Sequence, residues 1–474
     1  MAAARRWVIG LILAAGLALV LVPEVPAEPA QETKDFLKAG PDDRMQWWRE
    51  ARFGLFIHWG PVSLKGTEIS WSRANSNPTC PNKGPIPVEV YDNLYKAFNP
   101  VKFSGDEWVA VAKAGGMKYM VLTAKHCDGF LLWPSKFSDY NISQTPFKRD
   151  VCGELAAAAH KAGMKIGWYF SPMDWRDPDC RTERNATFVA TMQGELRELL
   201  SHYGEISILW FDTDGRTSPW NQPETYKLVR TLQPRIINNR LDIGSLAAYD
   251  AQQIGPNADY YTPEQRIGGF DNQRPWETCM TLGTQWAWKP NDTIKSLKKC
   301  IDILVRCAGG DGNLLLNVGP MPTGEIEPSQ VARLKEMGAW LGKYGRSIYG
   351  TRGGPFRPGA WGANTHKGNT IYLHVLRWPG ERIVLPAIDR RIVSHSVLTG
   401  GSATVTQTDE GITVSVPPGS RDKLDTIVKL QLDGPATGVT PVTAQHVRLN
   451  LVKTTEGPSI REFQLFAPKE GGEE

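Results

Sequence analysis

The sequence predicts an α/β fold, a (β/α)8-like (TIM) barrel with a C-terminal antiparallel β-sandwich domain. From about residue 46 to residue 348, β-rich apolar runs alternate with amphipathic helical patterns in about eight units, which favours a barrel over an open sheet. A polar or ionisable residue follows most of these runs, and barrels carry their chemistry at the C-terminal ends of the strands. After residue 350, a Gly/Pro-rich stretch precedes closely spaced short strands, which is the pattern of a β-sandwich.

The barrel prediction depends on the apolar runs and on the helices between them. The expected strands are Phe53–Trp59, Tyr119–Lys125, Lys165–Ser171, Ile206–Asp212, Arg235–Arg240, Asp259–Thr262, Trp276–Leu282 and Asn313–Val318. The expected helices include Ser104–Ala114, Cys152–Ala162, Asn185–Tyr203 and Thr293–Cys307. Glycine follows the first two of these helices, as is common where a helix ends before a strand. No Gly-rich phosphate loop follows the first strand, which counts against a dinucleotide-binding domain.

Residues 350–468 form the predicted β-sandwich domain. Its expected strands are Thr370–Leu376, Arg382–Leu385, Ala403–Thr408, Gly411–Val416, Thr426–Leu432 and Val447–Val452. We expect residues 31–349 to form the catalytic barrel and residues 469–474 to be a disordered tail.

Residues 1–30 have the pattern of an export signal. Arg5 and Arg6 supply a positive start, Trp7–Val22 is apolar, and small residues offer cleavage after Ala27 or Ala30. The apolar run is shorter than the roughly 20 residues of a spanning helix, which favours a cleaved peptide over an anchor. We therefore expect a secreted or periplasmic protein with no stable membrane insertion after cleavage. The seven cysteines suit an oxidising compartment, but their pairing stays open.

Composition narrows the class of partner. The formal net charge is +4, and the basic residues are scattered without a basic stripe, which argues against a nucleic-acid partner. The chain has 17 tryptophans, and several stand beside polar residues at expected strand ends. Most of them suit a hydrophobic core, but aromatic faces at a polar site also suit the apolar faces of sugar rings.

Several expected strands end in residues that carry chemistry. His58 and His126 follow the first two strands, Tyr169 lies on the third, Asp212 ends the fourth and Arg240 ends the fifth. Two of only eight histidines therefore fall at the ends of consecutive strands. Since the C-terminal ends of barrel strands meet at one mouth, these side chains are expected to form one polar site.

Carboxylates at separate strand ends indicate acid/base or nucleophilic work on an acetal. A retaining glycosidase uses two carboxyl groups, one as nucleophile and one as acid/base. Because the two carboxyls suffice, we expect neither a metal nor an organic cofactor. Asp212 and Glu264 are the favoured pair, whereas Asp128, Asp174 and Asp214 are at least as well explained as caps or loop residues.

Four motifs resemble those of a known family. They are Phe53-Gly-Leu-Phe-Ile-His-Trp-Gly60, Lys125-His-Cys-Asp-Gly-Phe130, Trp210-Phe-Asp212 and Gly312-Asn-Leu-Leu-Leu-Asn-Val-Gly-Pro320. In this order and spacing they are similar to the family 29 glycoside hydrolases, the retaining α-L-fucosidases. The resemblance covers roughly residues 45–350, with a weaker likeness beyond.

The resemblance implies roles for the carboxylates. It makes Asp212 the nucleophile, because the family nucleophile follows a Trp at the fourth strand end. It favours Glu264 as the acid/base, in a segment similar to the one that carries this residue in some members. Glu277 is the rival for that role, and it could instead position neighbours of the nucleophile or bind a sugar hydroxyl.

The resemblance also implies a set of substrate-binding residues and two departures from the family pattern. The implied substrate-binding residues are His58, Trp71, His126, Tyr169, Trp210, Arg240 and Trp286, of which Trp286 faces the C6 methyl of fucose. Cys127 replaces the second histidine of the family's His-His pair, and Ser70 stands where an acidic residue usually precedes Trp71.

The expected function is therefore an exo-acting retaining α-L-fucosidase that releases terminal α-L-fucose from fucosylated oligosaccharides or glycoconjugates. Two alternatives stay open. One is a retaining glycosidase for a related sugar such as galactose. The other, motivated by Cys127 and Ser70, is a non-catalytic carbohydrate-binding protein on a degenerate barrel.

Overall fold

A parallel sheet forms the first part of the molecule. The computed structural model describes residues 43–74, 84–213, 218–233, 236–241 and 253–436. The strands are β1 (Phe53–Ile57), β2 (Tyr119–Lys125), β3 (Lys165–Phe170), β4 (Ile208–Phe211), β5 (Ile236–Ile237), β6 (Glu277–Thr281) and β7 (Asn313–Val318). Their order is β5-β4-β3-β2-β1-β7-β6, and every neighbouring pair is parallel.

The expected strand Asp259–Thr262 closes this sheet through single bridges. Tyr260 pairs with Asn238 beside β5, and Tyr261 pairs with Trp276 beside β6, both in parallel. The segment thus occupies the position of an eighth strand between the two edges of the sheet. It is short because Pro263, which follows at once, has no N–H to donate.

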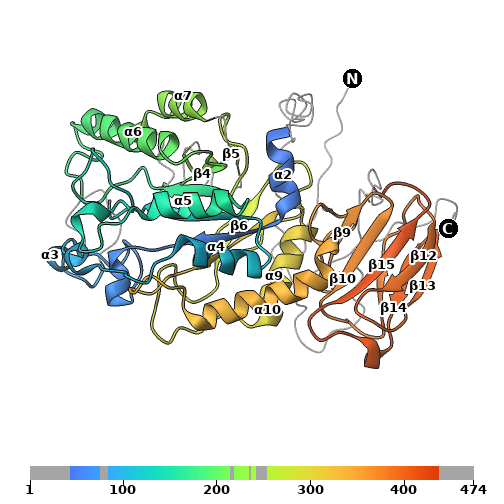
Figure 1. The fold of residues 1–474 in the computed structure, drawn as a ribbon. Helices are drawn as coiled ribbons and strands as arrows, with labels where there is room; N and C mark the ends of the chain where they lie inside the picture. Colours follow the sequence, from blue (N-terminus) through green and yellow to red (C-terminus); the bar gives the residue numbers. More distant parts are fainter. Residues whose placement is uncertain (1–42, 75–83, 214–217, 234–235, 242–252, 437–474) are drawn as a thin grey trace, which may run out of the picture.

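Helices lie between the strands and cover the sheet (Figure 1). They are α2 (Asp43–Ala51), α3 (Val88–Tyr91), α4 (Gly105–Ala114), α5 (Val151–Lys161), α6 (Asn185–Ser201), α7 (Gln222–Leu232), α9 (Leu297–Gly309) and α10 (Pro328–Tyr344). Single 3₁₀ turns are Pro61–Lys65, Leu94–Ala97, Ile142–Gln144, Ser218–Trp220, Asn239–Leu241, Gly345–Ser347 and Pro418–Ser420. The helix expected from Thr293 begins only at Leu297, because the Ser296 side chain caps it by accepting the N–H of Lys299. No helix in the described ranges is long and apolar enough to cross a membrane.

The inside of the barrel is filled with aromatic rings rather than left as a channel. Phe56, Tyr169 and Trp210 belong to one buried cluster that also contains Tyr260 and Leu315. The Phe56 and Trp210 ring centroids are 5.3 Å apart. These rings form a rigid layer directly beneath the strand ends, where the polar residues lie.

The second part of the molecule consists of two antiparallel sheets. One has the order β12-β15-β10-β9-β8 and the other β11-β14-β13. Their strands are β8 (Arg352–Gly353), β9 (Gly362–Lys367), β10 (Thr370–Val375), β11 (Arg382–Leu385), β12 (Ile392–Val397), β13 (Thr404–Thr408), β14 (Gly411–Ser415) and β15 (Thr426–Leu432). The sheets share an apolar core of their own, as expected for a sandwich. The expected strand Val447–Val452 and the predicted tail lie outside the described residues. The boundary between barrel and sandwich at residue 350 stays a proposal, which the position of β8 directly after it supports.

The first sheet of the sandwich packs directly on the barrel. Figure 1 shows α9 beside β9 and β10. A Cβ on Gly309 of α9 would come within 2.4 Å of the Ala363 Cβ of β9, so only glycine allows this approach. The Lys298 ammonium donates to the backbone oxygen of Leu376 at 3.0 Å. The barrel and the sandwich therefore contact each other closely, through both apolar and polar groups.

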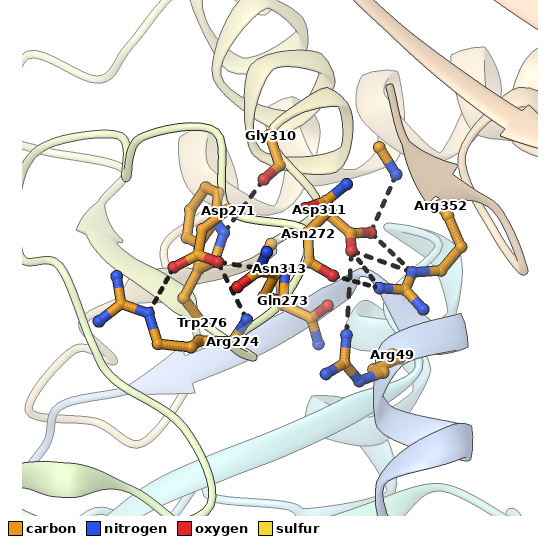
Figure 2. Close-up of polar contacts among 12 residues, drawn as sticks. Arg49, Asp271, Asn272, Gln273, Arg274, Trp276, Gly310, Asp311, Asn313 and Arg352 are labelled. Atoms are coloured by element: carbon orange, nitrogen blue, oxygen red, sulfur yellow. Dashed lines mark hydrogen bonds and ion pairs between the residues drawn. The ribbon is translucent and has the colours of Figure 1, made fainter. Parts of the chain in front are cut away.

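A buried carboxylate strengthens the same junction (Figure 2). Asp311 lies at 2.5 Å from the Arg52 guanidinium, forms an ion pair with Arg352 and lies 3.9 Å from Arg49. It also accepts the backbone N–H of Gly353 at 2.9 Å. Burial alone raises the pKa of Asp311, but Arg52 and Arg352 outweigh burial and lower it below its usual value. The carboxylate stays ionised and connects α2, the start of β7 and β8.

Replacing Asp311 with asparagine should destabilise the protein strongly. Asparagine tolerates the left-handed backbone at this position (φ 71°), so the change removes the charge with little added strain. Losing one partner of a buried ion pair costs about 3–5 kcal/mol, because the remaining charges are left unpaired. Urea unfolding would measure the loss. The control is Asp389→Asn in the exposed pair with Arg390, where we expect less than about 1 kcal/mol. Equal effects of the two substitutions would contradict the prediction.

Candidate active site

The C-terminal ends of five neighbouring strands bring the predicted side chains together. His58 directly follows β1, His126 follows β2, Tyr169 is the second-last residue of β3, Asp212 follows β4 and Arg240 lies in the turn after β5. Parallel strands place these ends on one side of the sheet. Side-chain contacts connect all five: the His58 and His126 ring centroids lie 5.7 Å apart, and His126, Tyr169, Asp212 and Arg240 contact one another in turn.

Asp212 is held from two sides. The Tyr169 hydroxyl donates to one carboxylate oxygen at 2.8 Å, and Arg240 Nη1 donates to the other at 2.6 Å. The Asp212 side chain keeps 22% of its surface exposed, whereas Arg240 keeps 6%. A charged donor and a phenol thus fix the orientation of a carboxylate that remains accessible at the barrel mouth.

Arg240 joins this carboxylate to a second one. Its Nη2 lies 2.8 Å from Glu264 Oε2, and its Nε donates to the Thr262 hydroxyl at 2.9 Å. The guanidinium also lies over the Trp210 ring, 4.4 Å from its centroid. Because one buried guanidinium contacts both carboxylates, Asp212 and Glu264 face the same site.

A wall of stacked rings borders the carboxylates. The His126 and Tyr169 rings stack with a centroid distance of 5.3 Å and an angle of 4°, and Tyr169 stacks on Trp210 at 5.4 Å. On the other side, the His58 and Trp286 rings lie 4.8 Å apart. The structure therefore brings together both predicted histidines and two of the three predicted tryptophans, Trp210 and Trp286.

Both histidines are neutral. Burial is the main cause that lowers the pKa of His58 well below its usual value, and burial lowers the pKa of His126 to about 3. A group whose pKa lies this low carries no charge near neutral pH. The histidines therefore present neutral hydrogen-bonding groups, which suit hydroxyls rather than anions.

Two residues that the prediction missed hold the Trp286 segment. The Glu68 carboxylate accepts the backbone N–H groups of Trp286 at 2.8 Å and of Ala287 at 3.0 Å. Asn317 Nδ2 donates to the Trp286 carbonyl at 2.7 Å. Asn317 lies in one of the motifs quoted above, so a signal for it was available. Glu68 gave no signal, since it acts through a loop 218 residues further along the chain.

Trp71 lies at the edge of the cluster. Its ring packs edge-on against Trp175 with centroids 5.0 Å apart, and 40% of its surface is exposed. The other predicted binding residues are all less exposed, for example His58 at 3% and Tyr169 at 1%. Trp71 is thus the predicted residue most available to the part of a substrate that extends into solvent.

The two departures from the family pattern have different surroundings. The Cys127 thiol is buried and lies 3.2 Å from the Ser171 hydroxyl. Ser70 is completely buried, and its hydroxyl lies 2.5 Å from His126 Nδ1. Cys127, Cys152, Cys180, Cys279, Cys300 and Cys307 are all free thiols.

Glu277 occupies a different level of the barrel. It is the first residue of β6, pairs with the first residue of β7 and has no exposed surface. Trp210 Nε1 donates to it at 3.2 Å, and the Tyr119 hydroxyl donates to its other oxygen. Burial raises its pKa to about 7. Glu277 therefore lies at the N-terminal end of its strand and supports the Trp210 ring from below.

The raised pKa of Glu277 predicts that the stability of the folded protein depends on pH. Its pKa is about 7 in the folded state and about 4.5 in the unfolded chain, so the folded protein binds the extra proton between these values. Stability should therefore fall as pH rises from 4.5 to 7, by roughly 3 kcal/mol from this group. Glu277→Gln should lack this contribution.

Urea unfolding across that pH range would test this through the difference between wild type and Glu277→Gln. The contributions of Glu195 and Asp128, whose pKa values burial also raises, cancel in the difference. A difference that stays constant with pH would contradict the prediction.

The fold and the site together define a class. Two carboxylates on one arginine, beside neutral imidazoles and aromatic rings at the C-terminal mouth of a parallel barrel, form the arrangement of a glycoside hydrolase.

Comparison with known proteins identifies the family. The model of the family described as Alpha-L-fucosidase matches residues 23–346, so the chain belongs to this family, glycoside hydrolase family 29. An alpha-L-fucosidase of Branchiostoma floridae is 29% identical over 413 residues, which cover 80% of this chain and 90% of that protein. The human plasma alpha-L-fucosidase is 28% identical over 393 residues, with 74% and 81% covered.

Solved structures agree in fold. Alpha-L-fucosidase isoenzyme 1 from Paenibacillus thiaminolyticus has a TM-score of 0.72 and 32% identity, covering 82% of this chain and 99% of that one. A family 29 enzyme from Bacteroides thetaiotaomicron, trapped as a covalent intermediate, has a TM-score of 0.72 and 27% identity over 82% of this chain and 96% of that one. The predicted fold class, family and hydrolase class are confirmed.

Proposed function

We propose that this chain is an exo-acting retaining α-L-fucosidase in which Asp212 is the nucleophile and Glu264 is the acid/base. The observation that carries the assignment is Arg240, whose guanidinium contacts both carboxylates at the barrel mouth. Family membership supports the substrate class. The burial of Glu277 beneath the Trp210 ring supports Glu264 over its rival.

In the first half of the reaction, Asp212 attacks the anomeric carbon of fucose. Glu264 donates its proton to the glycosidic oxygen, the bond to the leaving group breaks, and a covalent fucosyl-enzyme forms. The hydrogen bonds from Tyr169 and Arg240 hold the Asp212 carboxylate in one orientation before the attack. In the second half, Glu264 takes a proton from water, the water attacks the same carbon, and Asp212 leaves with its charge restored. Two inversions give fucose of retained configuration.

The remaining residues bind the sugar in this proposal. His58 and His126 contact hydroxyls as neutral imidazoles, and Trp286 provides an apolar wall for the C6 methyl group. Trp71 lies toward the leaving group. Terminal fucose on an oligosaccharide or glycoconjugate is the substrate class that these groups fit, and neither a metal nor a cofactor enters the scheme.

Proton NMR of aryl α-L-fucoside hydrolysis tests the proposal. We expect turnover in which α-fucose appears first and then mutarotates. First appearance of β-fucose would exclude the retaining mechanism. Hydrolysis of an aryl galactoside but not of the fucoside would favour the related-sugar alternative. Fucose binding without turnover, unchanged by Asp212→Gly, would favour a binding protein.

We also propose that the protein is exported, to the exterior or the periplasm. The basic start, the apolar run Trp7–Val22 and the small residues near Ala27 support this proposal. N-terminal sequencing of the protein from its natural source should begin at Glu28 or Gln31. A protein whose N-terminal residue is still Met1 would contradict cleavage of the export signal.

A further inference from the structure

The hydrogen bonds of His58 define which of its ring nitrogens carries the proton. His58 Nδ1 lies 2.6 Å from Asn317 Oδ1. The Asn317 amide cannot be reversed, because its Nδ2 donates to the Trp286 carbonyl at 2.7 Å. An amide oxygen only accepts, so Nδ1 of His58 must be the donor. Since the ring is neutral, Nε2 of His58 carries a lone pair and accepts.

Ser70 imposes the opposite arrangement on His126. The Ser70 hydroxyl oxygen accepts the backbone N–H of Asp128 at 2.9 Å and lies 2.5 Å from His126 Nδ1. Among the described residues, that nitrogen is the acceptor within reach of the hydroxyl hydrogen. If Nδ1 were protonated instead, this buried hydroxyl hydrogen would have no acceptor, at a cost of about 1–3 kcal/mol. The hydroxyl therefore donates, and the proton of His126 resides on Nε2.

The position of Ser70 is itself fixed by its neighbours. Its backbone N–H donates to the Tyr91 hydroxyl at 2.8 Å, and that hydroxyl donates to the Asp128 carboxylate at 2.6 Å. Ser70 has a left-handed backbone (φ 58°) and no exposed surface. The stacking of His126 on Tyr169 holds the ring plane. Both the hydroxyl and the imidazole are therefore preorganised.

We propose that Ser70 is a positioning residue that holds His126 in the Nε2–H tautomer, so that His126 donates to one sugar hydroxyl while His58 accepts from another. The recognition role rests on the proposed function, whereas the tautomers belong to the protein without substrate. The two histidines therefore select the direction of two hydrogen bonds to the sugar as well as the positions of two hydroxyl oxygens. Nδ1 of His58 is already bonded to Asn317, and Nδ1 of His126 is already bonded to Ser70. The Nε2 atoms are therefore the ring nitrogens that contact the sugar.

Nitrogen-15 NMR of histidine-labelled protein tests the tautomers without any substrate. The resonances of His58 and His126 are assigned by their loss in His58→Gln and His126→Gln. We expect the wild-type spectrum to show a proton on Nδ1 of His58 and on Nε2 of His126. A proton on Nδ1 of His126 overturns the proposal, whether or not the chain hydrolyses fucosides.

The same spectrum of Ser70→Ala tests the cause. Without the hydroxyl, both His126 nitrogens should move toward the average of two exchanging tautomers, and the His58 signals should stay in place. Ser72→Ala is the matched control, because it removes another buried hydroxyl of the same loop, one that bonds to Thr67 and to the Glu68 carbonyl. A His126 pattern that is unchanged in Ser70→Ala overturns the role of Ser70. The wild-type spectrum remains decisive for the tautomer if Ser70→Ala does not fold.

Substrates with a single altered hydroxyl test the recognition role. In aryl α-L-fucosides, replacing a hydroxyl by fluorine keeps a weak acceptor, and replacing it by hydrogen keeps none. At the position that His126 contacts, the ratio of kcat/KM for the fluoro and deoxy substrates should fall by about 2–10-fold from wild type to Ser70→Ala, the range of one hydrogen bond. At the position that His58 contacts, the ratio should not change. Equal ratios in both proteins at every position contradict the recognition role, and absence of turnover in wild type contradicts the proposed function instead.

Discussion

Asp212→Gly is expected to lower kcat/KM for an aryl α-L-fucoside by about 10⁴-fold or more, because it removes the nucleophile of a covalent mechanism. Azide should restore turnover, since the space left by the carboxylate admits a small anion beside the anomeric carbon. The azide then inverts the configuration once, and the product should be β-L-fucosyl azide. Chromatography and NMR of the product identify the anomer.

The surroundings of Asp212 make this result specific to its role. Its carboxylate accepts hydrogen bonds from Tyr169 and Arg240. When Asp212 is replaced by glycine, these two donor residues should keep their positions on β3 and in the turn after β5. The fold should therefore survive. As a control, the melting temperature of the variant should lie within a few degrees of that of the wild type. Retention of more than about a tenth of the activity, or formation of the α-azide, would assign the nucleophile elsewhere.

The catalytic half of the molecule could be predicted from the sequence because parallel strands place their ends together. His58, His126, Tyr169, Asp212 and Arg240 each lie at or next to a strand end, and one rule of barrel geometry brings them to one mouth. Their mutual contacts in the structure agree with that rule. The position of Glu277 at the start of an expected strand was also a usable signal, since it places this carboxylate at the end of the barrel opposite the mouth.

What the sequence could not show depends on contacts between distant loops. The Glu68 carboxylate holds the Trp286 segment, and the Ser70 hydroxyl faces a histidine 56 residues away. Neither contact follows from a periodic pattern, because loops have none. In the sequence Ser70 is only a departure from the family pattern, whereas its geometry gives it a definite partner, His126.

The sequence prediction lacks the sandwich strands β8, β9 and β12, and for β9 the cause is comparable. Its sequence is polar, yet Asn364 and Thr365 are fully buried. Asn364 exchanges two hydrogen bonds with the backbone of Phe356, and the Thr365 hydroxyl donates to the Ser347 carbonyl at 2.6 Å. Side-chain hydrogen bonds compensate the burial of polar groups, so a rule based on apolar alternation fails at this strand.

Glu264→Ala has the second largest expected effect, and the effect depends on the leaving group. General acid catalysis contributes about 10²–10⁴-fold, so a fucosyl-oligosaccharide should lose that much in kcat/KM. An aryl fucoside with a strongly acidic phenol needs no proton for departure and should retain most of its first step. Its fucosyl-enzyme would then accumulate, because the base for the second step is missing, and a burst of phenol should precede slow turnover.

Azide distinguishes Glu264 from Glu277. In Glu264→Ala it should attack the fucosyl-enzyme without needing a base, so that two inversions give α-L-fucosyl azide. Glu277 lies beneath the Trp210 ring with no exposed surface, so Glu277→Ala should lose stability and show no rescue by azide. Rescue of Glu277→Ala but not of Glu264→Ala would reverse the assignment. Because Arg240 contacts both Asp212 and Glu264 at the barrel mouth, whereas Glu277 is fully buried at the start of β6, the geometry supports rescue of Glu264→Ala.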